Sequence, residues 1–289
     1  INNMIKNKNN IELLDGAMGS EFIKRGVKLP NHIWSAYLNI ESPELIYNIH
    51  KEYLDAGANY ITTNTFRTTP RAYLKIGSTK DDARKSLKSA IRIANNAANT
   101  DTKILGSIAP LEDCYRPDLF PGFNNAKNEF KELGQWFIEE NVDIFLLETM
   151  NSIKETLAAI DAIKDFSIPI WVSFVLKNGN EILSGESLSE IIRILENNKV
   201  IKRILLNCNP LPKTNDALEI MSSNCSIPWG IYPNLGIGEP SPNGDIKNIY
   251  SDENFLKTIK SSIKHGASIV GACCGSSPKH IKLLKNSVC

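Results

Sequence analysis

Three of the six cysteines lie where apolar, strand-like runs of the 289-residue chain end. Cys208 follows the run KRILLN, and the adjacent pair Cys273 and Cys274 follows SIVGA. Three thiolates that leave one coordination position free are typical of a catalytic zinc site. Cysteine is also a small buried hydrophobe, so ordinary packing remains the alternative interpretation for each of the three.

The adjacency of Cys273 and Cys274 restricts how they can bind one ion. Neighbouring residues of a regular strand point to opposite faces, so both sulfurs can reach the same ion only where the strand breaks. Gly271 and Gly275 flank the pair, and glycine readily adopts the backbone conformations that such a break requires.

Two carboxylates also follow apolar runs, Asp15 after ELL and Glu148 after IFLL. A carboxylate at the end of a buried strand is unfavourable unless it meets a cation. One interpretation is a pair of acids that binds the ammonium group of a ligand. The alternative is local structure, with Asp15 in an Asp-Gly turn and Glu148 in the first turn of a helix.

None of the four histidines follows a strand-like run. We interpret all of them as structural or solvated: His32, His50, His265 and His280. No Ser–His or Cys–His pairing is visible, so a nucleophile activated by a general base is disfavoured. A metal ion would then have to activate the nucleophile.

Eight apolar runs of strand length alternate with helical patterns along the chain. Most are continuously apolar, which is typical of parallel strands buried on both faces. The predicted strands are Ile11–Leu14, Asn59–Thr63, Lys103–Ile108, Val142–Leu147, Ile170–Val175, Lys202–Asn207, Pro228–Tyr232 and Ser268–Ala272.

Helix signals occupy the segments between these strands. Apolar residues recur there at helical spacing, and each series follows a residue that favours the N-cap position of a helix. The predicted helix caps are Ser42, Asn151, Ser251 and Ser277.

These alternating units predict an α/β protein with a single (β/α)8 TIM barrel over residues 1–289, of which residues 1–10 form a flexible tail. An open doubly wound sheet is the alternative, but it usually has fewer units at this length and a glycine-rich first turn. In a barrel of this kind the active site lies where strands end. Asp15, Glu148 and the three cysteines all fall at that end, and strands six and eight are next-but-one neighbours.

The charge and the apolar content of the chain disfavour two classes of partner, nucleic acid and membranes. The formal net charge is +1, and no basic arm or acidic tail indicates nucleic acid or a charged membrane. No run approaches the ~20 apolar residues of a membrane span, and the polar start lacks the apolar stretch of a signal peptide. Six cysteines are too sparse for a disulfide scaffold, so we expect a reducing cytosol. The remaining cysteines are interpreted as unligated: Cys114, Cys225 and Cys289.

Several motifs, taken together and in order, resemble the homocysteine S-methyltransferase family from about Glu12 to Leu284. They are DGAMGSEF, AGANYITTNTF, GSIAP, LLETM, LNCNP, YPNLG and GACCGSSPKHI. The resemblance implies a (β/α)8 barrel in which Zn²⁺ is held by Cys208, Cys273 and Cys274. It also implies that the homocysteine sulfur takes the fourth position.

The same resemblance assigns the substrate contacts. It implies that Asp15 and Glu148 hold the amino group of homocysteine, and that backbone amides around Gly16, Ala17 and Met18 lie near its carboxylate. Asn234, in the YPN motif, is a candidate fourth zinc ligand before substrate arrives. Thr149 differs from the residue that betaine-using members carry, which favours the branch that uses sulfonium donors.

A zinc centre with three thiolates carries excess negative charge, which favours a cationic methyl donor. S-methylmethionine, S-adenosylmethionine, betaine and thetins all fit, and methionine would be the product. Trp34, Phe66 and Tyr115 are candidates to face such a cation, although ordinary packing is the more common role of an aromatic residue. The alternatives are a zinc- and homocysteine-binding barrel without catalysis, and the homocysteine module of a larger methionine synthase. No feature of the sequence specifies an oligomeric state.

Overall fold

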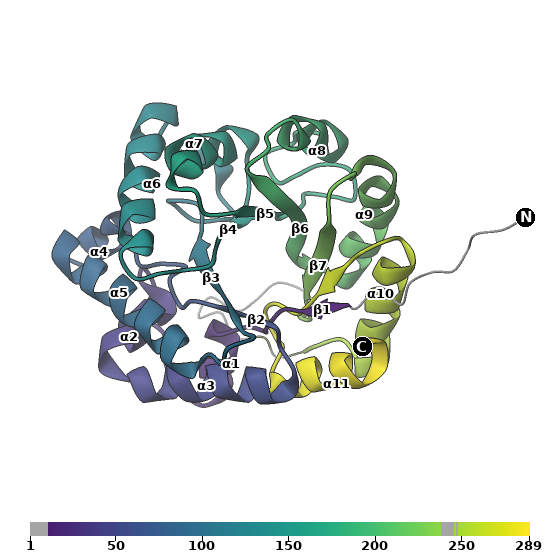
Figure 1. Cartoon of the computed structure of the whole chain (residues 1–289), viewed down its shortest axis with the longest axis horizontal. Coiled ribbons are helices and arrows are strands. Elements are labelled where there is room, and N and C mark those ends of the chain that lie inside the picture. The colour runs from purple at the N-terminus through teal and green to yellow at the C-terminus, as the bar shows by residue number, and fades with distance from the viewer. Residues whose placement is uncertain (1–10, 238–245, 247) are drawn as a thin grey trace, which may run out of the picture.

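The computed structural model describes residues 11–237, 246 and 248–289. Within them, eight parallel strands curve into a nearly closed barrel with helices around the outside (Figure 1). The strands are β1 Glu12–Leu13, β2 Tyr60–Thr62, β3 Lys103–Ile108, β4 Ile144–Met150, β5 Ile170–Phe174, β6 Ile201–Pro210, β7 Trp229–Asn234 and β8 Ile269–Val270. The predicted (β/α)8 barrel is therefore confirmed. The predicted tail at residues 1–10 lies outside the described residues.

The strand order β1-β8-β7-β6-β5-β4-β3-β2 leaves β1 and β2 as the neighbours that close the barrel. Asn59 forms this junction, because its amide donates to the Leu13 carbonyl and its Oδ1 accepts from the Leu13 amide, both at 2.8 Å. Farther along, Asp15 accepts hydrogen bonds from the Thr62 amide at 2.7 Å and the Thr62 hydroxyl at 2.9 Å. Side chains thus complete a ladder that the short β1 cannot make alone.

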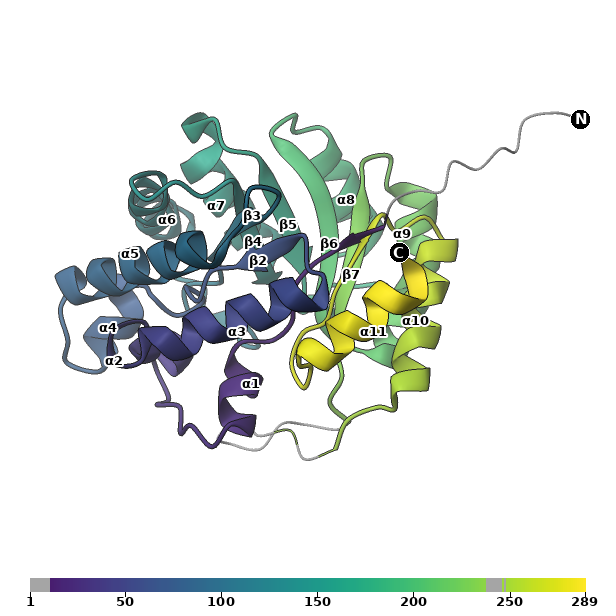
Figure 2. The same cartoon turned by 60° about the horizontal axis from the view of Figure 1, so that its bottom comes forward.

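Helices connect and surround the strands. They are α1 Gly19–Lys24, α2 Leu38–Glu41, α3 Pro43–Ala56, α4 Pro70–Lys75, α5 Lys80–Ala97, α6 Phe123–Ile138, α7 Ile153–Ile163, α8 Leu188–Glu196, α9 Leu211–Asn224, α10 Asp252–Lys264 and α11 Pro278–Val288. Figure 2 shows α3 and α11 side by side across one flank, where the aliphatic stem of Lys285 packs on Gly57. An early and a late part of the chain therefore support each other at the seam of the barrel.

Three of the predicted caps occupy the N-cap position, directly before the first residue of their helices: Ser42, Ser251 and Ser277. The prediction of Asn151 as a cap was wrong by one residue. Ser152 caps α7 instead, because its hydroxyl accepts from the Glu155 amide at 3.2 Å. The Asn151 side chain donates to the carbonyl of Cys114 at 3.2 Å, so it holds the loop after β3 rather than the helix.

The barrel interior is filled by a cluster of strand residues, separate from the larger core between strands and helices. At the end where the strands begin, this cluster includes Tyr60 and Trp171, whose ring centroids are 5.0 Å apart. The guanidinium of Arg203 lies over the Trp171 ring at 4.4 Å and pairs with Glu12 at 2.5 Å. The Tyr60 hydroxyl donates to the same Glu12 carboxylate. The ion pair of Arg203 and Glu12 therefore fills this end of the barrel interior.

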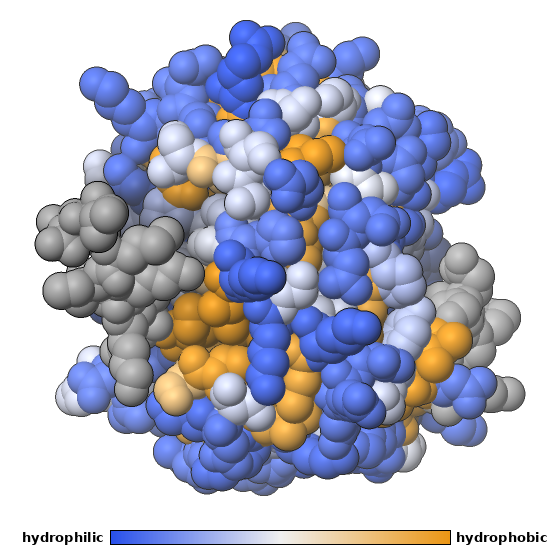
Figure 3. Space-filling model, turned by 90° about the vertical axis from the view of Figure 1, so that its right-hand side faces the viewer, coloured by the Kyte–Doolittle hydropathy of each residue, from blue (hydrophilic) through white to orange (hydrophobic). Residues whose placement is uncertain are grey.

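One face of the molecule shows how hydrophilic and apolar side chains are distributed on its surface. Figure 3 looks onto the side that carries α9 and α10, where hydrophilic side chains dominate and apolar patches lie between them. Within residues 11–237, 246 and 248–289, no helix combines the length and the apolar character that a bilayer crossing needs.

Candidate active site

Cys208 lies near the end of β6, where the strand leaves its regular register. Its φ of +55° is in the left-handed region, which a residue other than glycine rarely adopts. The flanking asparagines hold this conformation. The Asn207 Oδ1 accepts from the Thr149 amide at 3.0 Å, and the Asn209 Oδ1 accepts from the Leu176 amide at 2.7 Å. The left-handed conformation of Cys208 thus changes the direction of its side chain relative to a regular strand.

Cys273 and Cys274 follow β8 at the break that their adjacency requires. The Cys273 amide donates to the Pro233 carbonyl at 2.8 Å, and the Cys274 carbonyl accepts from the Leu235 amide at 2.9 Å. Both bonds fasten this segment to the end of β7. Gly275 then turns the chain with a φ of +81°, a conformation that favours glycine.

The three sulfurs meet within 4.8 Å of one another. Cys208 Sγ lies 3.4 Å from Cys274 Sγ, and Cys273 Sγ lies 4.0 Å from Cys274 Sγ. Zinc–sulfur bonds of about 2.3 Å in tetrahedral geometry place neighbouring sulfurs about 3.8 Å apart. The observed spacing lies close to this value, so the three thiols fit a zinc ion.

The thiols cannot all ionise without a cation. Hydrogen bonds from the other two thiols stabilise a thiolate on Cys208 and lower its pKa well below the ordinary value. Interaction with Cys208 raises the pKa of Cys273 and of Cys274 well above theirs, because a second thiolate would lie beside the first. A bound cation would remove that repulsion. The cluster is therefore chemically suited to a metal.

Asp15 and Glu148 lie at the same end of the barrel as the thiols. Burial raises the pKa of Asp15 to about 7, despite its two hydrogen bonds from Thr62. Burial likewise raises the pKa of Glu148 to about 7, and the charge of Asp15 adds to the effect. Glu148 accepts hydrogen bonds from the Ser107 hydroxyl and, at 3.4 Å, from the Tyr232 hydroxyl. Neutral donors thus stabilise these acids only in part, and a cation would favour their ionised forms.

The Gly16–Met18 segment is held tightly between two other parts of the chain. The Ala17 amide donates to the Ser276 hydroxyl at 2.9 Å, and the Ala17 carbonyl accepts from the Tyr53 hydroxyl at 2.7 Å. A Cβ on Gly16 would come within 2.7 Å of both of these side chains. Glycine is therefore required at position 16, and the Ala17 amide, predicted to be near a substrate carboxylate, already has a partner.

Sequence reasoning did not anticipate several of these supporting hydroxyls. Ser107, Tyr232 and Ser276 lie inside the motifs GSIAP, YPNLG and CCGSS, but nothing in their type or spacing indicated which groups they contact. Tyr53, in the helix before Gly57, was not among the predicted site residues. Asn234 Oδ1 accepts from the Gly236 amide at 2.7 Å, and its role as a fourth ligand stays a prediction.

The three aromatic candidates differ in their surroundings. Arg67 lies 5.0 Å from the centre of the Phe66 ring, so one cation already faces that residue. Trp34 packs on Gly19, where a Cβ would meet its Nε1 at 2.2 Å. The Tyr115 hydroxyl donates toward Cys208 Sγ at 3.7 Å. Tyr115 is therefore the candidate that contacts the sulfur cluster.

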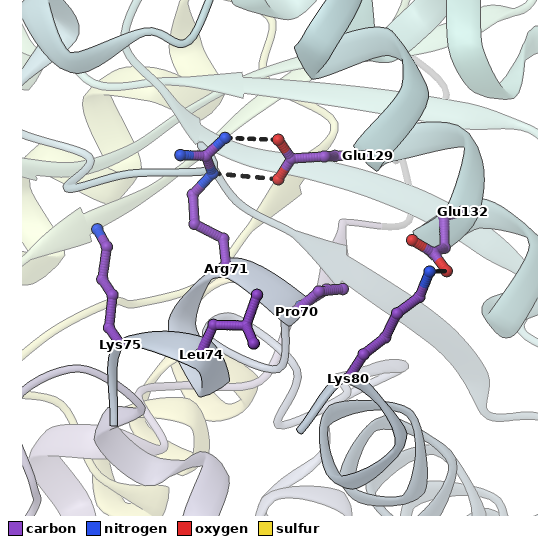
Figure 4. Close-up of a pocket in the computed structure, with 7 residues that line it drawn as sticks. All are labelled: Pro70, Arg71, Leu74, Lys75, Lys80, Glu129 and Glu132. Carbon is purple, nitrogen blue, oxygen red and sulfur yellow. Dashed lines mark hydrogen bonds and ion pairs between the residues drawn. The ribbon is translucent and has the colours of Figure 1, made fainter. Parts of the chain in front are cut away.

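A surface pocket of about 510 Å³ lies apart from this site, between α4, the start of α5 and α6. Figure 4 shows its lining residues: Pro70, Arg71, Leu74, Lys75, Lys80, Glu129 and Glu132. Arg71 forms a two-pronged ion pair with Glu129, and Lys80 pairs with Glu132. Its charges are thus largely neutralised within the pocket, and none of its lining residues belongs to the thiol and carboxyl site.

The fold and the site define a barrel protein with a thiol cluster and two carboxyl groups at the ends of its strands. Comparison with known proteins makes the assignment specific. The family profile described as homocysteine S-methyltransferase matches residues 12–288. The chain belongs to that family, and it is a methyltransferase.

Individual relatives cover nearly the whole chain. Homocysteine S-methyltransferase 2 of Arabidopsis thaliana is 27% identical over 97% of this chain and 93% of its own length. Homocysteine S-methyltransferase YbgG of Bacillus subtilis is 26% identical over 93% of this chain and 92% of its own length. The metallated form of the homocysteine methyltransferase MmuM from Escherichia coli has a TM-score of 0.84 at 24% identity, with 96% of each chain covered. That structural match supports the barrel fold.

Proposed function

We propose that this protein transfers a methyl group from a cationic donor to the sulfur of homocysteine, with zinc held by Cys208, Cys273 and Cys274. The observation that carries this proposal is the meeting of three thiols within 4.8 Å in a barrel of this family. The names of the plant and bacterial relatives support the acceptor, and the metallated form of MmuM supports a metal.

The chemistry of the donor set favours zinc. Soft thiolates select zinc over hard cations such as magnesium or calcium, and three protein ligands leave one position open. When bound, zinc would supply a Lewis acid that keeps the acceptor sulfur as a thiolate at neutral pH. All six cysteines are free, which is in keeping with the reducing cytosol that we propose as its location.

Asp15 and Glu148 would bind the ammonium group of the amino acid acceptor. Desolvation raises the pKa of each acid to about 7. An ammonium group placed between them would donate hydrogen bonds to both carboxylates, and its positive charge would favour their ionised forms. Of the backbone amides predicted for the carboxylate, we assign Gly16 and Met18, because the Ala17 amide donates to Ser276.

The charge of the site supports a cationic donor. Three thiols and two carboxyl groups meet at this end of the barrel, and each becomes negative when it ionises. A sulfonium or quaternary ammonium group is attracted to such a site and loses its positive charge as the methyl group leaves. S-methylmethionine, S-adenosylmethionine, betaine and thetins meet this requirement. Two relatives are named as selenocysteine methyltransferases, at 26% and 25% identity, so selenocysteine is a second acceptor to test.

A donor and acceptor panel tests the proposal. We expect about one zinc per chain in reduced protein, and methionine formation from homocysteine with at least one cationic donor. Cys208→Ser should lose both zinc and activity, whereas Cys289→Ser, at an exposed cysteine outside the cluster, should keep both. Zinc and homocysteine binding without turnover would favour the non-catalytic barrel. Turnover that requires a cobalamin-bound methyl group would favour a module of a larger synthase.

A further inference from the structure

The loop between β3 and α6 reaches the sulfur cluster through one side chain. The Tyr115 hydroxyl lies 3.7 Å from Cys208 Sγ and is the donor of this contact. The residue as a whole is still 49% exposed. Tyr115 therefore bridges the solvent-facing loop and the buried thiol, with its polar tip at the cluster.

Cationic residues of α4 and of the segment before it anchor this loop on one side. The Glu112 carboxylate accepts from Arg71 Nη1 at 3.0 Å and pairs with Lys75. The Arg67 guanidinium donates to the Glu112 carbonyl at 2.6 Å. Figure 4 shows Arg71 held in turn by Glu129 of α6. Three cations thus fix a residue that lies three positions before Tyr115.

The other side of the loop is tied to the start of α7. The Asn151 side chain donates to the carbonyl of Cys114, the residue directly before Tyr115, at 3.2 Å. The Leu111 amide donates to the Glu155 carboxylate at 2.8 Å. Since anchors act from two elements, the tyrosine has little freedom to leave the thiol without breaking several polar contacts.

We propose that Tyr115 is a positioning residue of the metal centre, and that Glu112 acts through it. The Tyr115 hydroxyl donates to the Cys208 thiolate and withdraws part of its negative charge. Three thiolates exceed the charge of a divalent ion by one, so a donor to one of them stabilises the loaded cluster. The inference rests on the proposed function only in taking the cluster as a metal centre.

Zinc affinity, measured by competition with a chromophoric chelator, tests the inference. Tyr115→Phe keeps the ring and removes the donor, and we expect roughly tenfold weaker zinc binding. Glu112→Gln should give a smaller loss, and the double variant should match Tyr115→Phe because Glu112 acts through the tyrosine. Tyr37→Phe is the matched control, since the Tyr37 hydroxyl donates to the Lys28 carbonyl at an exposed position.

A spectrum of the cobalt-substituted protein gives a readout that does not depend on affinity. Removing a hydrogen bond raises the energy of the sulfur electrons, so the thiolate-to-cobalt bands of Tyr115→Phe should move to longer wavelength. Identical bands and zinc affinities within twofold of the wild type would overturn the inference. A wild-type protein that binds neither zinc nor cobalt would instead refute the proposed metal centre itself.

Discussion

The two ends of the barrel treat buried charge in opposite ways. Where the strands begin, Glu12 has a cationic partner in Arg203, which in turn lies over Trp171. Where the strands end, Asp15 and Glu148 accept hydrogen bonds from hydroxyl and amide groups, and burial raises the pKa of each to about 7. The acid of the first end is thus paired with a cation of the chain, whereas the contacts of Asp15 and Glu148 are hydrogen bonds from neutral groups.

Two residues of the second end also have strained backbone conformations. Thr149 and Cys208, both at strand ends near the site, have φ values of +56° and +55°. Asn207 joins them, because its Oδ1 accepts from the Thr149 amide and its Nδ2 donates to the Thr149 hydroxyl. Strain of this kind persists only where surrounding contacts enforce it. The first end therefore contributes stability through its ion pair, and the hydrogen bonds of Asn207 fix the backbone of the second end.

The largest expected effect is on KM, and it comes from the same substitution, Glu to Gln, made at each end of the barrel. Glu148→Gln removes a charge that would bind the acceptor's ammonium group. Because a hydrogen bond between charged groups is lost, we expect a roughly 100-fold increase in KM for homocysteine. Glu12→Gln, the matched change at the other end, should leave KM unchanged and lower stability. Steady-state kinetics checks this expectation, and equal KM values for the wild type and Glu148→Gln would contradict it.

A substitution at the paired end should affect stability alone. Arg203→Met leaves Glu12 without its cation, and we expect the free energy of unfolding to fall by about 2 kcal/mol, since the pair is only partly exposed. Lys202→Met, at the exposed neighbouring position, is the control. Urea titration measures the loss. A stable Arg203→Met protein with impaired turnover would show that the ends are not independent.

The smallest effect concerns pH. Because burial raises the pKa of Asp15 to about 7, the folded protein without ligand favours the protonated acid. The contribution of protonated Asp15 to the free energy of unfolding is fully present below about pH 4 and is lost as the pH rises through 7. Between pH 6 and 8, the metal-free wild type should lose about 1 kcal/mol relative to Asp15→Asn. Urea unfolding at both pH values measures this difference, and parallel pH profiles would count against a buried, unpaired acid.

The sequence alone predicted the barrel and the position of each chemical group at the strand ends. This was possible because buried parallel strands are continuously apolar, so each polar residue that follows one stands out. The cap of α7 was misplaced because Asn151 and Ser152 are both good cap formers, and only the packing of the loop after β3 assigns Asn151 elsewhere. Tyr53 and Tyr115 were not assigned to their partners, since those contacts join segments far apart in the chain.

The number of sulfur atoms around the metal tests the central claim most directly. X-ray absorption at the zinc edge should find three sulfur ligands in the reduced wild-type protein, from Cys208, Cys273 and Cys274, and four after homocysteine is added. Fewer than three sulfurs in the protein alone, or a count that homocysteine leaves unchanged, would contradict a thiol cluster that binds and activates the acceptor sulfur.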